Sequence, residues 1–383
     1  MALKGLKVVE MAGLAPSPFA GMILADYGAE VIRVDPLKPI LSTNILARGK
    51  KSIAINIKKP DGVDIVKKLV FGADILIEPF RPGVMERLGL GPGLLMQENK
   101  KLIYARLSGY GQSGSMTQAA GHDINYLAMN GVLSKLGRST EPPFPPINLL
   151  ADFAGGSALC VMGIMMALFS RNSTGNGQIV DAALSDGAAY ISSFLFSSKN
   201  QVPMMWPGKR GCNVLDSGCP YYNTYKTKDD KYMAVGALEP QFYSSFLHGL
   251  DINNDEYPNL PQQLDMPRWN ELFAIFTDKF QSKTQNEWVQ IFINIDACVS
   301  PVLSFSEAAV HPHNVEREMF MNVQDGVSEP APSPKLSDNP AKPFTKIPNL
   351  GEHTMEILES LGYDKEASQS LLLSHVINVS NNS

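Results

Sequence analysis

Three short segments each combine an ionisable side chain with surroundings that could put it to chemical use. The first is Gly121-His122-Asp123-Ile124-Asn125-Tyr126, where a loop rich in Gly and Ser meets an apolar helical pattern. His122 is expected at a helix N-terminus, where the partial positive charge disfavours imidazolium and leaves a neutral base. The first N–H groups of such a helix can bind an oxyanion. The alternative is a histidine that only caps the helix.

The second segment, Asn148-Leu149-Leu150-Ala151-Asp152-Phe153-Ala154-Gly155-Gly156, places an acid between an apolar run and two glycines. The glycines permit close backbone approach and indicate that something lies against this helix start. The alternative is that Asp152 is only an N-cap.

The third segment carries Glu239, which ends an expected strand and precedes Pro240. A surface glutamate in a first helical turn is the alternative there.

Basic and methionine residues form two further groups. The basic ones usually indicate a solvated face, but at the strand ends of one sheet they would suit phosphates. They are Arg48, Lys50, Lys51, Lys58, Lys59, Arg81 and Arg87.

The methionines are ordinary core residues by default. Alternatively, they form a pliable surface that accepts varied apolar chains. They are Met162, Met165, Met166, Met204 and Met205.

The first 110 residues predict the framework that positions these groups. Apolar runs at 7–9, 31–34, 52–55, 74–76 and 102–107 alternate with helical patterns at 19–27 and 63–70. This βαβ pattern indicates an α/β fold with a parallel sheet wrapped by helices. Asp35 closes the second strand, as in dinucleotide-binding domains. However, the first turn lacks G-x-G-x-x-G and contains Pro16 and Pro18, which cannot donate hydrogen bonds to a pyrophosphate. A hydride-transfer enzyme is therefore a minor possibility.

Shifts in composition predict two domains. Residues 1–198 are expected to form a large domain, followed by a linker over 199–219 and a smaller α+β domain over 220–323. A proline-rich return linker over 324–349 then leads to a C-terminal segment, 350–383, that rejoins the large domain.

Bulk composition narrows the class of protein. The chain has 383 residues, of which 44% are hydrophobic, and a net charge of −5, which gives no support to nucleic-acid binding. Cys160, Cys212, Cys219 and Cys298 lie far apart and predict reduced thiols with no metal site. The longest apolar stretch, Ala158–Phe169, is shorter than the roughly 20 residues that a spanning helix needs, so a soluble enzyme without a membrane partner is expected.

Several blocks, taken in order, carry a resemblance that covers essentially the whole chain. They are Val8-Val9-Glu10, Ile77-Glu78-Pro79-Phe80-Arg81-Pro82-Gly83-Val84, Leu102-Ile103-Tyr104-Ala105-Arg106, Gly121 to Tyr126, Asn148 to Phe153, Gly236 to Tyr243 and Gly351-Glu352-His353-Thr354. With these blocks the chain resembles the α-methylacyl-CoA racemases, within the class III CoA-transferase (CaiB/BaiF-like) family.

The resemblance implies a Rossmann-like large domain, a smaller α+β domain and an interlocked homodimer. Its active site would lie where the large domain of one chain meets the small domain of the other. His122, supported by Glu239, would serve one face of the substrate α-carbon, and Asp152 the opposite face. An enolate would form between them, held by backbone N–H near Asp123. The implied reaction interconverts (R)- and (S)-2-methylacyl-CoA in branched-chain fatty acid metabolism, with bile acid metabolism as a further setting.

The resemblance also implies the ligand contacts and the setting. No cofactor is expected beyond the CoA of the substrate, and relatives work in peroxisomes and mitochondria, although the tail ends Ser380-Asn381-Asn382-Ser383 and lacks an S-K-L address. CoA is expected to contact Ile55, Asn56, Ile57, Lys58, Arg81, Arg87, Gly121, Asp123, Ile124, Asn125 and Tyr126. Three places depart from the family pattern: Pro36 replaces the usual Arg, for which Lys38 is a candidate substitute, and Asn56 replaces Asp. The third is Asp216-Ser217-Gly218-Cys219-Pro220, where D-G-G-A-P is more usual.

The main alternative is a CoA-transferase of the same fold, in which Asp152 attacks a thioester covalently. Such transferases tend to have a glycine-run loop in the small domain, and the stretch from Tyr221 to Glu239 contains no such run. They also do not need the His122–Glu239 pair. A non-enzymatic acyl-CoA binding protein is a more distant alternative.

Overall fold

The computed structural model describes residues 1–38, 44–253, 255–322, 328–342, 344 and 346–380. The chain forms two compact units: the first contains residues 1–132, 146–192 and 315–383, and the second contains 133–145 and 193–314. Residues 199–219, expected to be a linker, therefore lie in the second unit. There the Asp216 carboxylate accepts N–H bonds from Gly211 and Asn213 and holds this stretch in a closed loop. Part of the expected return linker, 324–327, 343 and 345, lies outside the described residues, as does residue 323 at the end of the expected small domain.

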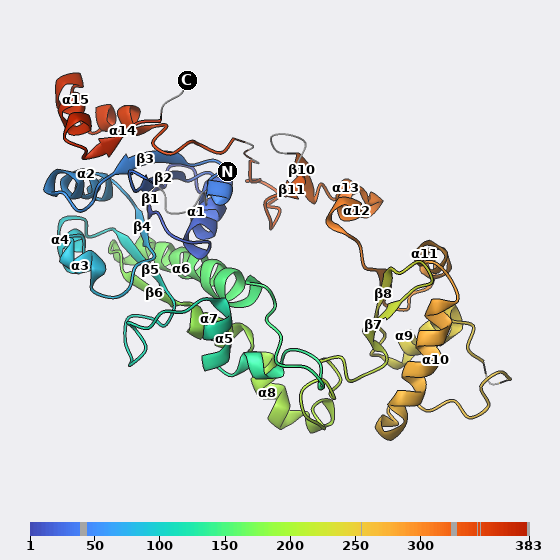
Figure 1. Ribbon diagram of the computed structural model, residues 1–383. Helices are drawn as coiled ribbons and strands as arrows, with labels where there is room; N and C mark the ends of the chain where they lie inside the picture. The colour runs from blue at the N-terminus through green and yellow to red at the C-terminus, as the bar shows by residue number, and fades with distance from the viewer. Residues whose placement is uncertain (39–43, 254, 323–327, 343, 345, 381–383) are drawn as a thin grey trace. The chain divides into compact units, whose positions relative to one another are not determined.

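The first unit is built on a seven-stranded sheet with the order β12-β3-β2-β1-β4-β5-β6 (Figure 1). Its neighbouring strands run parallel except β12, which pairs antiparallel with β3. Such strands are buried on both faces, which explains their continuous apolar runs and confirms the predicted α/β fold with a parallel sheet. The strands are β1 (Lys7–Met11), β2 (Glu30–Asp35), β3 (Lys51–Ile55), β4 (Ile75–Glu78), β5 (Ile103–Ser108), β6 (Ile179–Ala183) and β12 (Ile377–Asn378).

Helices cover this sheet, and a proline occupies the first helical position of α1, α2 and α4, where the missing N–H costs nothing. The helices are α1 (Pro16–Asp26), α2 (Pro60–Phe71), α3 (Val84–Arg87), α4 (Pro92–Glu98), α5 (Asp123–Met129), α6 (Leu159–Thr174), α7 (Leu184–Ile191), α14 (Thr354–Ser360) and α15 (Lys365–Leu373). A π-helical segment, Leu149–Ala158, runs directly into α6. The hairpin of β10 (Phe320–Asn322) and β11 (Ser328–Pro330) also belongs to this unit.

The π-helical segment and α6 together form one helix, Leu149–Thr174, of 26 residues. Its mean hydropathy reaches 1.8 over 18 residues, so by length and composition it could cross a membrane. The expectation of an apolar stretch of only a dozen residues was therefore wrong. Asp152 and the two following glycines interrupt the apolar run in the sequence but do not end the helix. Only 33% of its most apolar window is buried within this chain.

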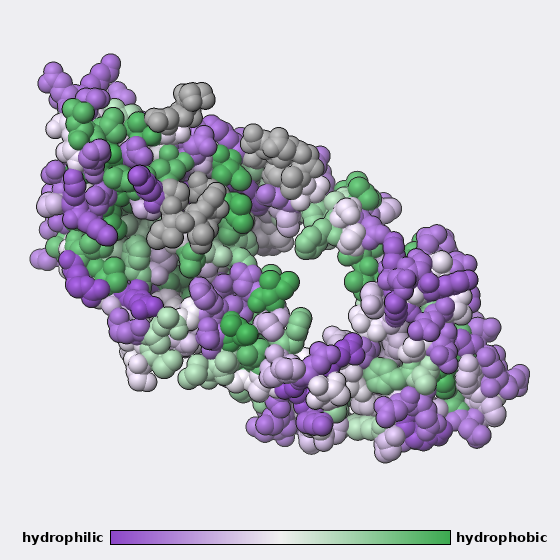
Figure 2. All heavy atoms as spheres, viewed as in Figure 1, coloured by the Kyte–Doolittle hydropathy of each residue, from purple (hydrophilic) through white to green (hydrophobic). Residues whose placement is uncertain are grey.

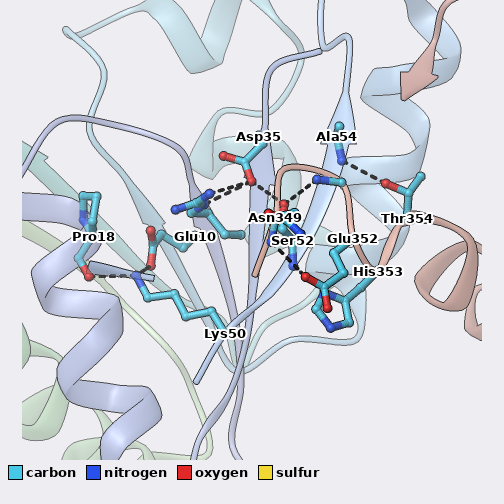
Figure 3. Close-up of polar contacts among 12 residues, drawn as sticks. Glu10, Pro18, Asp35, Lys50, Ser52, Ala54, Asn349, Glu352, His353 and Thr354 are labelled. Atoms are coloured by element: carbon cyan, nitrogen blue, oxygen red, sulfur yellow. Dashed lines mark hydrogen bonds and ion pairs between the residues drawn. The ribbon is translucent and has the colours of Figure 1, made fainter. Parts of the chain in front are cut away.

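The C-terminal segment attaches to β3 through hydrogen bonds that involve side chains as well as backbone groups (Figure 3). The Ser52 hydroxyl donates to Asp35 and accepts from the Gly351 N–H. The Ser52 N–H donates to His353 Nδ1, and the Ala54 N–H donates to the Thr354 hydroxyl. The bonds to Gly351, His353 and Thr354 span about 300 residues of sequence and fix α14 beside β3.

The second unit has an antiparallel sheet, β7-β8-β9, packed against helices through an aromatic core. Tyr225 and Phe280 stack with ring centroids 5.1 Å apart, and Phe246 meets Phe276 edge to face at 4.9 Å. Its elements are β7 (Tyr222–Lys226), β8 (Tyr232–Gly236), β9 (Val299–Pro301), α8 (Ser193–Gln201), α9 (Pro240–Gly249), α10 (Trp269–Gln281), α11 (Gln285–Phe292) and α12 (Phe305–Val310), with α13 (Pro312–Glu316) at the boundary.

Candidate active site

A cavity of about 560 Å³ opens at the carboxyl edge of the parallel sheet. Its walls include the turns that follow β1, β4 and β5, at Gly13, Arg81 and Tyr110. The sheet order 3-2-1-4-5-6 reverses direction between β1 and β4, so the cavity lies at the topological switch point. Ligands of open α/β sheets bind at this place. The volume falls within the range typical of small-molecule sites.

His122 and Asp152 both line this one cavity. His122 is the N-cap residue of α5, as the sequence predicted, and its backbone N–H donates to Asn125 Oδ1 at 3.1 Å. The Tyr126 hydroxyl turns back to donate to the Gly121 carbonyl, while its ring packs edge to face on Tyr110 at 4.9 Å. The loop before α5 is therefore held in place, and it presents the histidine to the cavity.

Asp152 lies in the first turns of the π-helical segment, and the N-cap position belongs to Asn148. The N-cap interpretation of Asp152 was therefore wrong. Burial is the largest influence on the carboxyl group and raises its pKa; the nearby Asp123 raises it further, while the Asn148 hydrogen bond and His122 oppose the shift. The net effect raises the pKa of Asp152, so its protonated form persists to higher pH than that of an exposed aspartate.

Gly155, the first of the two glycines after Asp152, brings another backbone close, as expected, and that backbone is the middle of α7. A Cβ atom on Gly155 would lie 2.4 Å from the Ala188 nitrogen, and one on Gly187 would lie 1.9 Å from the Gly155 oxygen. Neither position has room for a side chain. This contact holds α7 against the helix that carries Asp152, and Leu184 at its start lines the cavity.

The turn after β4 is fixed by a buried ion pair. Glu78 Oε1 accepts from Arg106 Nε at 2.8 Å, and Glu78 Oε2 accepts from the Phe80 N–H at 2.8 Å. Arg106 also reaches Glu86 at 2.8 Å. The turn therefore holds Arg81 at the cavity wall, where it is exposed.

The residues predicted to contact CoA divide into two groups. Gly121, Asn125, Tyr126 and Arg81 line the cavity. The others do not: Asp123 is buried at the start of α5, Ile124 and Arg87 are exposed, and Ile55 lies in the core. The turn at Asn56, Ile57 and Lys58 follows β3, so it lies at the same sheet edge, about 10 Å from β1 at the usual strand spacing. An elongated ligand is needed to reach both places.

Several basic residues proposed for phosphate binding serve internal structure instead. Lys50 pairs with Glu10 at 2.6 Å, and neither side chain is exposed (Figure 3). Arg48 is buried against Asp26 at 2.8 Å. Lys51 bridges Glu30 and Glu356, and Lys59 donates to the Ser374 carbonyl. The hypothesis of a phosphate cluster was therefore wrong for Lys50 and Arg48, which are buried against acids of the first unit. Lys51 and Lys59 make surface contacts with acids and a carbonyl of the same unit.

Glu239 belongs to the second unit, at the N-cap of α9 three residues after β8. Its side chain is exposed. A cavity of about 810 Å³ lies in the same unit, with Gly236 and Cys298 among its lining residues. The pKa of Cys298 is raised by burial first and then by the negative charges of Asp296 and Glu239.

Some lining residues were not predicted as site residues. Leu14, Pro79, Leu107 and Tyr110 form an apolar wall. The sequence signal that could have identified them is their position in the chain, because they lie at the ends of β1, β4 and β5 or in the turns that follow these strands. Within the described ranges, no group of three or more His, Cys, Asp or Glu side chains could hold a metal ion.

Comparison with known proteins gives consistent results. The CoA-transferase family III model matches residues 3–354. The α-methylacyl-CoA racemase of Mus musculus is 53% identical, covering 96% of this chain and 95% of that protein, and the Homo sapiens racemase is 52% identical over the same shares. A CAIB/BAIF family protein from Brucella suis has a similar structure, with a TM-score of 0.79 and 25% identity, covering 94% of this chain and 99% of that one.

Proposed function

The chain belongs to CoA-transferase family III, and on that premise we propose that it is an isomerase that interconverts (R)- and (S)-2-methylacyl-CoA thioesters. The observation that carries the proposal is the shared cavity, because His122 and Asp152 line one space at the switch point of the sheet. Identity of 53% to a racemase supports the reaction type.

The chemistry requires one proton acceptor and one proton donor on opposite faces of the α-carbon. His122 removes the proton from one face, and Asp152 delivers a proton to the other; the reverse reaction exchanges these roles. The raised pKa of Asp152 supports this assignment, because a carboxyl group that keeps its proton can donate it. Glu239 would support His122 from the small domain of a partner chain.

The negative charge that develops on the thioester oxygen also has to be stabilised, because an α-proton is only weakly acidic. The first N–H groups of α5, which begins at Asp123, have no acceptor one turn earlier in the helix. We place the enolate oxygen there, next to His122. Arg81 at the cavity wall and the turn at Asn56 to Lys58 would hold CoA, and no cofactor besides the substrate is required.

The decisive test is incorporation of solvent deuterium at the α-carbon of a 2-methylacyl-CoA, without any acceptor acid. We expect both epimers to gain deuterium and to approach the same mixture, as read by mass spectrometry and chiral separation. A CoA-transferase that uses Asp152 as nucleophile would instead require a free carboxylate acceptor. Strict dependence on that acceptor would reject the racemase, and binding without exchange would indicate an acyl-CoA binding protein.

We further propose that a second copy of the chain covers the exposed face of α6. Cys160, Ile164 and Ala167 face the core of the unit and are fully buried or nearly so. Two turns of the same helix carry a second apolar stripe, with Met166 60% and Phe169 81% exposed. Apolar side chains also reach the surface around α6 and α7 in Figure 2. A helix that is apolar on two faces needs a second partner surface.

Charge on this stripe is expected to prevent dimer formation. Met166→Asp combined with Phe169→Asp should give a monomer in sedimentation velocity and lose most racemase activity, since the site would lack the partner's small domain. The control is Leu373→Asp, which adds charge at a 72% exposed leucine on α15. A wild-type protein that sediments as a monomer, or a double variant that remains dimeric, would contradict this assignment.

A further inference from the structure

The Asp123 side chain is buried and touches the backbone of the segment that carries Asp152. Asp123 Oδ2 accepts the N–H of Ala151 at 2.7 Å and the N–H of Asp152 at 2.9 Å. Both donors lie in the first turns of the π-helical segment, where N–H groups have no partner earlier in the helix. A carboxylate from α5 therefore supplies the cap for a helix that begins more than twenty residues later.

The same residue is joined covalently to His122. The backbone of one proposed base is thus adjacent to Asp123 in sequence, and the backbone of the other is hydrogen-bonded to the Asp123 side chain. Asp123 is not among the residues that line the cavity, and its side chain is 3% exposed. Its side chain is therefore placed to orient the two bases without touching substrate.

We infer that Asp123 is a positioning residue that sets the separation of His122 and Asp152. This inference rests on the proposed function, because a fixed separation matters only if both groups act on one carbon. A base displaced by about 1 Å can lose about 100-fold in rate, so two bases on different segments require a rigid connection. The bond pattern provides one, in which a single carboxylate joins the start of α5 to the start of the Asp152 helix.

The charge of Asp123 gives it a second effect on Asp152. The groups that act on the Asp152 carboxyl are Asn148, which donates a hydrogen bond, and the side chains of Asp123 and His122. The Asp152 charge in turn raises the pKa of the nearby Tyr126. Among these, Asp123 is the negative neighbour that raises the pKa of Asp152, after the larger effect of burial. Asp123 Oδ1 is also buried without a hydrogen-bond partner among the described residues, which is uncommon for a purely structural cap.

The test is Asp123→Asn, which removes the charge and replaces the carboxylate with a neutral amide, a weaker acceptor for the two N–H groups. We expect kcat to fall about 10- to 100-fold with KM changed less than about threefold. The limb of the pH profile that reports Asp152 should move to lower pH, because its like-charged neighbour is gone. A matched control is Asp181→Asn, since Asp181 accepts the Gln112 N–H in the same unit at 3.1 Å. That control should retain wild-type kinetics.

Two outcomes would overturn the positioning role. One is an Asp123→Asn enzyme with wild-type kcat and an unchanged pH profile. The other is loss of the folded state, by circular dichroism, in Asp123→Asn but not in Asp181→Asn, which would make Asp123 a residue of stability alone. The wild-type enzyme is measured in the same deuterium assay. If the proposed function is wrong, wild type itself shows no exchange. If only the positioning role of Asp123 is wrong, wild type is active.

Discussion

Asp152→Ala and His122→Ala should each abolish epimerisation, with kcat falling about 10²- to 10⁴-fold, the usual contribution of one general acid or base. The two side chains line one cavity but come from different segments, His122 from the N-cap of α5 and Asp152 from the π-helical segment. Removal of one leaves the other able to take a proton from its own face. No proton can then be delivered to the opposite face.

The two variants should therefore fail in complementary ways. Each is expected to exchange the α-proton of one epimer with solvent and not to convert it, and the exchanging epimer should differ between the variants. Deuterium incorporation into each pure epimer, followed by chiral separation, measures this directly. Glu239→Gln is the comparison: it should weaken catalysis less, because it acts on His122 and not on the substrate.

Some results would count against the two-base assignment. If either alanine variant epimerises at the wild-type rate, that residue has a different role. If both variants retain exchange at the same epimer, the two groups do not face opposite sides of the carbon. Far-ultraviolet circular dichroism should match wild type, since neither side chain belongs to a hydrophobic core cluster of the described chain.

The framework of the first unit was predictable because buried parallel strands have a simple signal. The runs at 31–34 and 52–55 fall within β2 and β3, and both are apolar because both faces of the sheet are covered. β6 was missed. As an edge strand it has exposed positions, and Asp181 interrupts its apolar pattern. β12 is only two residues long and pairs with β3, more than 300 residues earlier, which no local pattern reveals.

The candidate site was partly predictable for a different reason. The position of His122 follows from a local feature, the change from a Gly-rich loop to a helix, and the structure places it at the N-cap. The role of basic residues is not local. Lys58 and Lys50 look alike in sequence, yet Lys58 is exposed and Lys50 is fully buried. Only tertiary contacts decide which cation is available to a ligand, and the same holds for the direction of the Asp123 side chain.

Lys50→Met should destabilise the fold by about 3–5 kcal/mol, because it leaves the Glu10 carboxyl buried without its counter-ion. Lys50 Nζ lies 2.6 Å from Glu10 Oε2 and also donates to the Pro18 carbonyl at 2.7 Å. Burial raises the pKa of Glu10 and lowers that of Lys50, so each group depends on the other to stay charged. Even the helix that covers the pair is adapted to it, since a Cβ atom on Gly21 would lie 1.7 Å from Glu10 Oε2.

Urea unfolding at neutral pH measures this loss, and the neighbouring lysine gives a matched control. Lys51→Met removes two ion pairs with exposed partners and should cost at most about 1 kcal/mol. The double variant Glu10→Met, Lys50→Met should recover much of the loss, because an apolar pair of similar volume needs no counter-ion. A Lys50→Met protein no less stable than Lys51→Met would show that the pair contributes little.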